Sequence, residues 1–583
     1  AGIAGAVEIP IPEEWAHATE GGFIAKINRP DFVRNVCDVM NRQEGDDLPV
    51  STFKGWEDGT FTTGTSHYER PAAAIQVPEW IPENCISCNQ CAFICPHAAI
   101  RPFIVTEEEE ARAPEGFICR DLPGPKKGLK YRIIVSPEDC YGCSICANVC
   151  PAPKKALVMK PIETQLDKQK YWDYAITLPR KENPMNKFTV RGSQFEPTYF
   201  EFSGACAGCG ETPYVHLVTN LFGDRMLIAN ATGCSSIYGA SAPSMPYCTN
   251  AEGQGPAWAN SLFEDNAEFG LGMHLGEIKL RRRVEEKLNE VLPSSDENTK
   301  TAIEEWLAGK DVGDGTRSRA EKLEAALNAK VSSHPEYKEI LALKDHFIKK
   351  SQWIFGGDGW AYDIGFGGLD HVLASGEDIN VLVLDTEVYS NTGGQSSKST
   401  PAAAIAKFAA AGKKTKKKDL GMIAVSYGYI YVAQIALGAD MNQAVKAIHE
   451  AESYPGPSLI IAYAPCINHG IKAGMGEASA EQKAAVECGY WCNWRYDPRL
   501  LDAGKNPFHL DSREPKGDFR KFLLGEVRYA SLQKLFPQEA EALFEKTEKD
   551  ARARRQSYVR MQKSFDLEMQ EHQAAKQTAA EHR

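Results

Sequence analysis

Two identical runs of four cysteines constrain this chain more than any other feature of its sequence. Each run has the spacing C-x2-C-x2-C-x3-C and is followed by a proline, and the members are Cys85, Cys88, Cys91, Cys95, Cys140, Cys143, Cys146 and Cys150. Such compressed spacing is typical of the ligands of [4Fe–4S] clusters. Structural zinc is the alternative, but zinc sites usually combine two CxxC pairs that a loop separates. A disulfide framework is expected in small secreted domains rather than in a chain of 583 residues. We therefore predict two [4Fe–4S] clusters.

The doubled run resembles that of bacterial ferredoxins, in which the fourth cysteine of each run binds the other cluster. The resemblance implies an α+β ferredoxin-like domain over residues 67–160 with two crossed ligand sets: Cys85, Cys88, Cys91 and Cys150, and Cys140, Cys143, Cys146 and Cys95. Neither set leaves an open iron for substrate, so the two clusters indicate an electron wire. Between the runs, residues 107–110, Lys126 and Lys127 are predicted to lie in a solvated loop, and Cys119 has no partner at ligand spacing.

The composition is typical of a large soluble protein. A chain of 583 residues with 43% hydrophobic residues can form roughly two to four domains with buried cores. No apolar run approaches the length of a membrane span, and the N-terminus lacks the basic and apolar regions of a signal peptide. The net charge of −12 argues against nucleic acid as the main partner. We therefore expect a cytoplasmic protein that binds neither membranes nor nucleic acid.

A second stretch, residues 356–395, has the pattern of a site for a diphosphate and a metal ion. Gly357-Asp358-Gly359 follows three apolar residues, so a strand is expected to end where glycines let the main chain approach phosphate and a carboxylate can bind Mg²⁺. A second apolar strand is predicted at residues 379–384, and Asp385 and Thr386 stand at its end. A glycine-rich connection in a doubly wound sheet is the alternative interpretation.

This stretch resembles the thiamine diphosphate motif, in which GDG is followed at about this spacing by two asparagines. Here Asp385 and Thr386 occupy the asparagine positions. The Thr386 hydroxyl and the Val388 carbonyl can still offer oxygen atoms to Mg²⁺. The resemblance therefore implies that the chain binds thiamine diphosphate and Mg²⁺.

Four more cysteines lie in short motifs of small residues outside the two runs. Cys206 and Cys209 form a CxxC in GACAGCGET, Cys234 lies in ATGCSSIYG, and Cys466 lies in APCINHG. Each motif alone is weak evidence, because a CxxC can be a redox dithiol and a lone cysteine is more often part of a core.

Taken together and in this order, the motifs resemble the C-terminal half of pyruvate:ferredoxin (flavodoxin) oxidoreductase, which uses thiamine diphosphate and three [4Fe–4S] clusters. The resemblance covers nearly the whole chain and includes NAEGQGPAWANSLFEDNAEFG, FGGDGWAYDIGFGGLDH and DTEVYSNTGGQ. It implies a doubly wound α/β thiamine diphosphate-binding domain over residues 161–583, with a helical insertion at about 271–350. Residues 1–66 would be a linker or the tail of a preceding domain.

The resemblance also implies a role for individual residues. The third cluster would be held by Cys206, Cys209, Cys234 and Cys466. Mg²⁺ would be held by Asp358, Thr386 and Val388. The residues that border thiamine diphosphate would be Glu211, Cys234, Gly357, Asp358, Gly359, Trp360, Thr386, Glu387, Val388, Tyr389, Ser390 and Asn391. Two of these, Glu211 and Asn391, would act in catalysis, and Asn391 would also face the substrate.

The activity that the resemblance implies is the reversible oxidation of pyruvate and coenzyme A to acetyl-CoA and CO₂. Electrons would pass one at a time through three [4Fe–4S] clusters to ferredoxin or flavodoxin. The pyrimidine-binding domain of this family has no candidate in residues 1–66, so an N-terminal half or a companion subunit is expected to supply it, in an enzyme that is a dimer as a whole. Two alternatives stay open: a subunit of a related 2-oxoacid:ferredoxin oxidoreductase, or a non-catalytic iron–sulfur electron-transfer subunit.

Other features are predicted to have structural roles. The charged helices near residues 271–350 and the basic run at residues 413–418 are interpreted as solvated surfaces, although the basic run could also bind ferredoxin or the phosphates of coenzyme A. Cys488 and Cys492 are expected one helical turn apart in a packed helix, and His469 is expected to be either a structural histidine or an acid–base group. After Pro515 the pattern predicts an amphipathic helix to the end of the chain.

Overall fold

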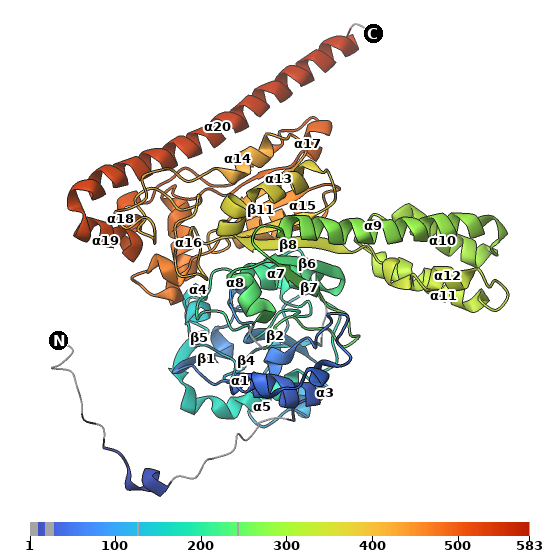
Figure 1. The fold of residues 1–583 in the computed structure, drawn as a ribbon, viewed down its shortest axis with the longest axis horizontal. Helices are drawn as coiled ribbons and strands as arrows, with labels where there is room; N and C mark the ends of the chain where they lie inside the picture. Colours follow the sequence, from blue (N-terminus) through green and yellow to red (C-terminus); the bar gives the residue numbers. More distant parts are fainter. Residues whose placement is uncertain (1–7, 9, 18–27, 125–127, 242–243, 582–583) are drawn as a thin grey trace. The chain divides into compact units, whose positions relative to one another are not determined.

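The computed structural model describes residues 8, 10–17, 28–124, 128–241 and 244–581. The chain divides into two compact units, residues 1–61 and residues 62–583 (Figure 1). In the shorter unit, Val33, Val36 and Cys37 are buried, and Phe32 packs edge-on against Trp56. Its helical elements are η2 (Glu13–His17), η3 (Val33–Cys37), α1 (Asp38–Asn41), η4 (Gly45–Asp47) and η5 (Val50–Phe53).

The longer unit begins with two small antiparallel sheets built around the two cysteine runs. Strand β1 pairs with β5, and β4 pairs with both β2 and β3. Helices α2 and α4 contain Cys91 and Cys146 respectively, and they pack against each other. The elements are η6 (Thr65–Tyr68), β1 (Gln76–Trp80), η7 (Pro82–Asn84), α2 (Gln90–Phe93), β2 (Ile100–Val105), α3 (Glu107–Ala111), β3 (Arg120–Asp121), β4 (Lys130–Val135), α4 (Ile145–Val149), β5 (Leu157–Pro161), η8 (Ile162–Thr164), η9 (Leu166–Lys168), α5 (Gln169–Ala175) and α6 (Val190–Ser193).

The described part of the segment between the cysteine runs forms helix and strands, so the prediction of a loop was wrong, although Glu107 and Glu108 are exposed as predicted. It contains β2, α3 and β3, and α3 starts with a capping box in which Thr106 and Glu109 exchange hydrogen bonds. Glu109 is only 5% exposed and forms an ion pair with Lys181. A charged run looked solvated because its buried partner lies far away in the sequence. Lys126 and Lys127 lie outside the described residues.

A mixed sheet organises the rest of the longer unit. Within the described residues it has eight strands in the order β13-β12-β10-β11-β9-β8-β6-β7. The six strands from β10 to β7 are parallel, and at one edge β12 pairs antiparallel with both β10 and β13. The strands are β6 (Met226–Ala231), β7 (Ala257–Ser261), β8 (Ser351–Gly357), β9 (Asn380–Asp385), β10 (Tyr431–Ile435), β11 (Ser458–Tyr463), β12 (Trp494–Tyr496) and β13 (Phe508–Leu510).

Helices cover both faces of this sheet (Figure 1). The central strands are buried along their whole length, as expected for parallel strands between two layers of helices. Each face has its own large apolar cluster. The helical elements are α7 (Thr212–Phe222), η10 (Gly223–Arg225), α8 (Cys234–Ser236), η11 (Ile237–Ser241), η14 (Gly359–Ile364), α13 (Phe366–Ala374), α14 (Leu420–Val425), α15 (Met441–Glu452), η15 (Ile467–His469), η16 (Met475–Glu477), α16 (Ala478–Glu487), α17 (Arg499–Asp502), α18 (Phe519–Gly525), α19 (Val527–Leu535) and α20 (Pro537–Glu581).

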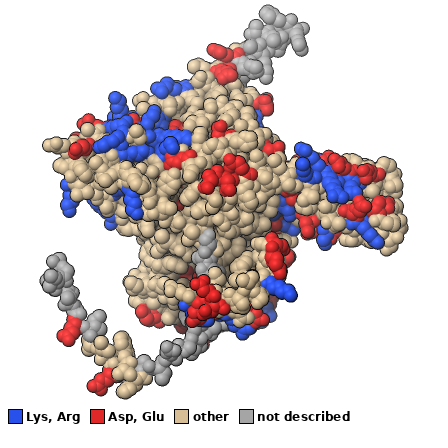
Figure 2. Space-filling model, viewed as in Figure 1, with Lys and Arg blue, Asp and Glu red and all other residues tan. Residues whose placement is uncertain are grey.

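Between β7 and β8 the chain forms helices that extend beyond the sheet. Helix α9 packs on β6 and β8 at its start and continues away from them (Figure 1). Its far end forms a separate apolar cluster with the next helices, centred on Leu288, Ile303 and Trp306. Basic and acidic side chains intermingle on their surface (Figure 2), as in the exposed pair Lys322–Glu305. The elements are α9 (Asn266–Val291), η12 (Leu292–Ser294), α10 (Glu297–Gly309), α11 (Thr316–Lys330), α12 (Tyr337–Leu341) and η13 (Lys344–His346).

Two further predictions about the C-terminal third need correction. Helix α16 ends at Glu487, so Cys488 and Cys492 do not share a helix, although both are buried in the same apolar cluster. Beyond Pro515 there are three helices, α18, α19 and α20, rather than one continuous helix. Among the described helices, none combines the length and apolar character needed to cross a membrane.

Candidate functional site

The predicted site residues converge at one edge of the large sheet. Strands β6, β8, β9 and β11 are adjacent and parallel, so their carboxyl ends meet at the same edge. Cys234 follows β6, Asp358 follows β8, Thr386 follows β9 and Cys466 follows β11. This edge is where ligands bind in open α/β sheets.

Three oxygen-bearing groups meet in the corner that the sequence predicts for Mg²⁺. The Thr386 hydroxyl lies 3.1 Å from Asp358 Oδ1 and 3.0 Å from the Val388 carbonyl oxygen. Ser397 Oγ donates to the other oxygen of Asp358. Burial and then the charge of Asp385 raise the pKa of Asp358, so a cation would stabilise its ionised form. This set of hard oxygen donors therefore fits Mg²⁺.

His469 contacts the backbone of the candidate Mg²⁺ corner. Its Nε2 lies 2.7 Å from the Thr386 carbonyl oxygen, and its side chain is completely buried. Burial and the charge of Arg528 lower the pKa of His469 to about 3. A neutral ring can then donate a hydrogen bond to Thr386. Of the two roles that the sequence allows for this histidine, the contact with Thr386 favours the structural one.

The side chain of Glu387 does not reach the predicted cofactor pocket. It is fully buried and points away from the pocket, towards Lys417 and Arg528. Lys417 Nζ lies 3.0 Å from its Oε1, and Arg528 Nη2 lies 2.8 Å from its Oε2. Lys417 also lies 2.7 Å from Asp385. Although burial opposes ionisation, Lys417 and Arg528 hold the pKa of Glu387 at about 2. Only the backbone of Glu387 can therefore face a diphosphate.

The basic run at residues 413–418 is part of this buried network, so the interpretation of a solvated turn needs correction. Lys413 Nζ donates to the backbone carbonyls of Ser397 and Thr400, and Lys418 Nζ donates to that of Tyr362. The side chain of Lys417 is only 7% exposed. Three of the five lysines thus fix the loops around the candidate metal corner.

We expect removal of the Arg528 charge to destabilise this network strongly. Arg528→Met would leave Glu387 and Glu526 buried without their common partner, which typically costs about 3–5 kcal/mol. The measurement is the urea-unfolding midpoint of the longer unit. Arg520→Met is the matched control, because Arg520 pairs with Glu541 at the surface and should contribute no more than about 1 kcal/mol. Equal effects of the two substitutions would contradict this account of the network.

A pocket beside the metal corner is lined by most of the residues predicted to border thiamine diphosphate. Its walls include Glu211, Cys234, Gly357, Asp358, Gly359, Trp360, Val388, Tyr389, Ser390 and Asn391. Gly359 has no room for a side chain, because a Cβ atom would lie 2.5 Å from the ring of Tyr389. Asn391 is exposed at this pocket. Thr386 is buried behind the pocket at the metal corner.

Glu211 is a buried carboxyl group with capacity for a further interaction. It is 4% exposed, and its Oε2 has no hydrogen-bond partner among the described residues. Burial raises the pKa of Glu211 to about 7, and the nearby hydroxyl of Tyr238 opposes this shift. A buried carboxyl oxygen that lacks a partner fits a cofactor bound in this pocket. The sequence analysis did not identify Tyr238, although it lies in the ATGCSSIYG motif.

The structure brings the twelve cysteines named in the sequence analysis into three groups. The first group is Cys85, Cys88, Cys91 and Cys150; the second is Cys95, Cys140, Cys143 and Cys146; the third is Cys206, Cys209, Cys234 and Cys466.

In the first group, burial raises the pKa of Cys91, and thiolate charges raise it further. These charges belong to Cys88, Cys85 and Cys150. In the second group, burial and then the charges of Cys143, Cys95 and Cys140 act in the same way on Cys146. Cys150 and Cys95 thus lie with the opposite run, as the ferredoxin pattern predicts.

The third group adjoins the pocket. Burial and then Glu211 raise the pKa of Cys234, and the thiolates of Cys209 and Cys466 add to this effect. Cys234 Sγ lies 3.2 Å from Ser390 Oγ, on the loop that follows β9. Asn468 links the same parts, since its Nδ2 donates to the Ser390 carbonyl at 3.3 Å and to Cys466 Sγ at 3.5 Å. The sequence analysis did not identify Asn468, although it lies in the APCINHG motif.

No group of His, Cys, Asp or Glu in the described ranges is arranged to hold a single metal ion. Four thiolates around one zinc ion would lie close together, because each Zn–S bond is about 2.3 Å long. In a [4Fe–4S] cluster each cysteine binds a different iron, so the sulfur atoms stand further apart. The spacing of each run along the sequence is that of cluster ligands.

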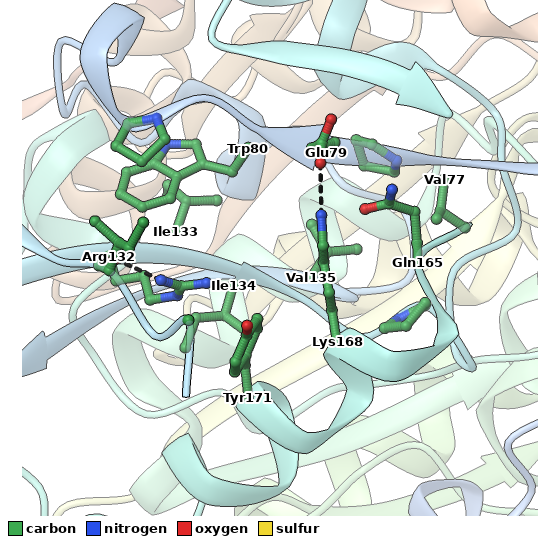
Figure 3. Close-up of a pocket in the computed structure, with 15 residues that line it drawn as sticks. Val77, Glu79, Trp80, Arg132, Ile133, Ile134, Val135, Gln165, Lys168 and Tyr171 are labelled. Atoms are coloured by element: carbon green, nitrogen blue, oxygen red, sulfur yellow. Dashed lines mark hydrogen bonds and ion pairs between the residues drawn. The ribbon is translucent and has the colours of Figure 1, made fainter. Parts of the chain in front are cut away.

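Another pocket lies among the strands of the ferredoxin-like part (Figure 3). Glu79 and Lys168 form an ion pair at 2.6 Å across it, and Arg132 lies 4.7 Å from the ring centre of Tyr171. The residues that line it include no cysteine and no residue predicted to bind thiamine diphosphate. It is therefore separate from the candidate site.

Three segments of the chain match known protein families. Residues 84–154 match the family described as "4Fe-4S dicluster domain", and residues 323–462 match "Thiamine pyrophosphate enzyme, C-terminal TPP binding domain". Residues 24–72 match a "Domain of unknown function". The chain therefore contains an iron–sulfur domain and a thiamine diphosphate-binding domain.

Close relatives are found among curated oxidoreductases. The chain is 59% identical over 562 residues to a pyruvate-flavodoxin oxidoreductase of Klebsiella pneumoniae, covering 96% of this chain and 48% of the relative. It is 54% identical over 563 residues to a pyruvate:ferredoxin oxidoreductase of Moorella thermoacetica, covering 95% of this chain and 48% of that protein. The chain thus spans about half the length of the curated relatives that it matches.

Proposed function

We propose that this chain is the half of a pyruvate:ferredoxin or pyruvate:flavodoxin oxidoreductase that holds the diphosphate end of thiamine diphosphate and the iron–sulfur clusters. The proposal draws on the likeness to these enzymes over nearly the whole chain. The observation that carries it is the position of the third cysteine group, whose member Cys234 also lines the pocket beside the metal corner. A cluster held there would adjoin the place where thiamine diphosphate binds.

Different residues of the pocket would bind the metal ion, transfer a proton and contact the substrate. Asp358, Thr386 and Val388 would hold Mg²⁺. Gly357 at the end of β8 and Gly359 after it would let the backbone approach the diphosphate. Glu211 can hold or release a proton at Oε2 near neutral pH, because burial raises its pKa to about 7. Asn391 would contact the substrate at the mouth of the pocket. Thiamine diphosphate, when bound, supplies the carbanion chemistry that 2-oxo acid decarboxylation requires.

The cysteine groups would conduct electrons away from this pocket. The third group is nearest to it, and the second group lies behind the third. Cys88 of the first group lines a surface groove, where an acceptor protein could approach. We assign the order third, second, first to the path towards ferredoxin or flavodoxin. Coenzyme A would be the co-substrate that receives the acyl group.

The wider assembly follows from the same proposal. Residues 67–160 would be the ferredoxin-like domain, and residues 161–583 a doubly wound thiamine diphosphate-binding domain with the helical insertion near residues 271–350. A further half or companion chain would supply the pyrimidine-binding domain, and the whole cytoplasmic enzyme would be a dimer.

The test is an anaerobic assay of the complete assembly with Mg²⁺, thiamine diphosphate and coenzyme A. We expect pyruvate to reduce ferredoxin or flavodoxin and to yield acetyl-CoA. Reduction by 2-oxoglutarate with none by pyruvate would instead favour a related 2-oxoacid oxidoreductase. If dithionite reduced the clusters and no 2-oxo acid did so, the chain would be a non-catalytic electron-transfer subunit.

A further inference from the structure

A short turn fills the space between the second and third cysteine groups. This turn is η16, and it lies between α4, which carries Cys146 of the second group, and the loop that carries Cys206 and Cys209 of the third group. Met475 of the turn is partly buried against the apolar cluster on that face of the sheet. The turn is therefore a protein layer between the two groups, and beside it the backbone N–H of Gly208 donates directly to the sulfur of Cys143.

Glycine is required on both sides of this layer. A Cβ atom on Gly476 would lie 2.5 Å from the Cys143 carbonyl oxygen, and one on Gly208 would lie 2.6 Å from the Met475 carbonyl oxygen. Real side chains essentially never come this close to backbone atoms. The backbone of the turn thus contacts the second group's loop on one face and the third group's loop on the other.

A hydrogen bond fixes the turn to the ferredoxin-like part. Asn148 Nδ2, at the end of α4, donates to the Gly476 carbonyl oxygen at 3.0 Å. Gly208 has a left-handed backbone with φ of 78°, which keeps the loop between Cys206 and Cys209 close to Met475. Both contacts hold the turn close to its neighbours.

We propose that Gly476 and Gly208 are positioning residues that set the distance between the second and third clusters and hence the rate of electron transfer between them. The proposal rests on the proposed function, because it requires a cluster at each cysteine group. Neither residue supplies a side chain to a cluster or to substrate, although the backbone N–H of Gly208 donates a hydrogen bond to the sulfur of Cys143. They act through the carbonyl groups of Cys143 and Met475. One electron leaves the third cluster and the same electron arrives at the second, so no further reactant is needed.

The main test is Gly476→Ala in the complete, cluster-loaded assembly. Its matched control is Gly204→Ala, because Gly204 lies in the same loop region as the third group, has ordinary backbone angles and leaves open space of at least 4 Å around the position that a Cβ atom would take. Asn148→Ala is a second variant that cannot disturb the core, since Asn148 is exposed and loses only its hydrogen bond to Gly476.

The readouts are iron content, the spin–spin interaction between reduced clusters in electron paramagnetic resonance, and the rate at which pyruvate reduces the second cluster. We expect Gly476→Ala to keep its iron, to weaken the spin–spin interaction and to slow electron transfer by about tenfold, as small misplacements of reacting groups do. Asn148→Ala should have a smaller effect in the same direction. Gly204→Ala should match the unmodified protein.

Two results would overturn the proposal. Gly476→Ala and Gly204→Ala could show the same spin–spin interaction and the same rate, or Gly476→Ala could lose iron, which would give it a role in cluster assembly rather than spacing. Failure of the proposed function is distinguished in the unmodified protein, where a missing third cluster would appear as iron content near eight atoms rather than about twelve.

Discussion

Replacing Asp358 by asparagine is expected to weaken Mg²⁺-dependent binding of thiamine diphosphate by at least about a hundredfold, or about 2.7 kcal/mol. Asparagine has nearly the same volume, and its amide oxygen can still accept a hydrogen bond from one of the two hydroxyls, Thr386 or Ser397, while its amide nitrogen can donate to the other. It lacks the negative charge of the one carboxylate among the three proposed Mg²⁺ ligands, Asp358, Thr386 and Val388. The site should therefore fold but fail to hold the metal and, with it, the diphosphate.

Isothermal titration of the complete assembly with thiamine diphosphate, at fixed Mg²⁺, measures this effect. Asp370→Asn is the matched control, since Asp370 accepts a hydrogen bond from Tyr427 and lies outside the pocket. Iron content should be unchanged in both variants, because no cysteine group includes Asp358. Unaltered cofactor affinity in Asp358→Asn would refute the metal assignment.

Several parts of the site could be predicted from the sequence because they depend on local order. Asp358 and Thr386 stand directly after apolar runs, and the carboxyl ends of parallel strands must meet at one edge. The spacing within each cysteine run is likewise a local property, and the pairing of Cys150 with the first run follows from a known pattern. For such residues, the neighbouring sequence is sufficient to predict their place in the site.

Other parts could not be predicted because they depend on partners far away in the chain. Glu387 follows Thr386, yet its side chain is drawn away from the pocket by Lys417 and by Arg528, which lies 141 positions further on. The basic run at residues 413–418 has the composition of a solvated turn, and only the carbonyl of Ser397 and the carboxylate of Asp385 show why Lys413 and Lys417 point inwards. Glu109 is likewise buried because it pairs with Lys181, which lies far away in the sequence.

The separation between the cysteine groups also cannot be predicted from the neighbouring sequence. Gly476 belongs to no motif with an evident function, and its requirement for glycine follows from contact with Cys143, more than 300 positions earlier. Long-range packing thus determines how two locally predictable sites are placed relative to each other. Electron transfer depends on that placement as much as on the ligands themselves.

Replacing Cys234 by serine is expected to block the first transfer of electrons out of the active site, whereas replacing Cys85 is not. Cys234 lines the pocket and belongs to the third group, while Cys85 belongs to the first group at the far end of the proposed path. In Cys234→Ser, reduction of any cluster by pyruvate should slow by at least about a hundredfold, which corresponds to about 2.7 kcal/mol in activation free energy. In Cys85→Ser, pyruvate should still reduce the remaining clusters, and only the delivery of electrons to ferredoxin or flavodoxin should fail.

Freeze-quench electron paramagnetic resonance after mixing with pyruvate separates these outcomes, because it follows the reduced clusters directly. Dithionite should reduce the remaining clusters in both variants, since a small reductant does not need the thiamine site. Cys119→Ser is the matched control, because Cys119 belongs to none of the three groups and should leave iron content and rates unchanged. The order of the path would be reversed if Cys85→Ser stopped the reduction of all clusters by pyruvate while Cys234→Ser allowed it, because the electrons would then have to enter at the first group.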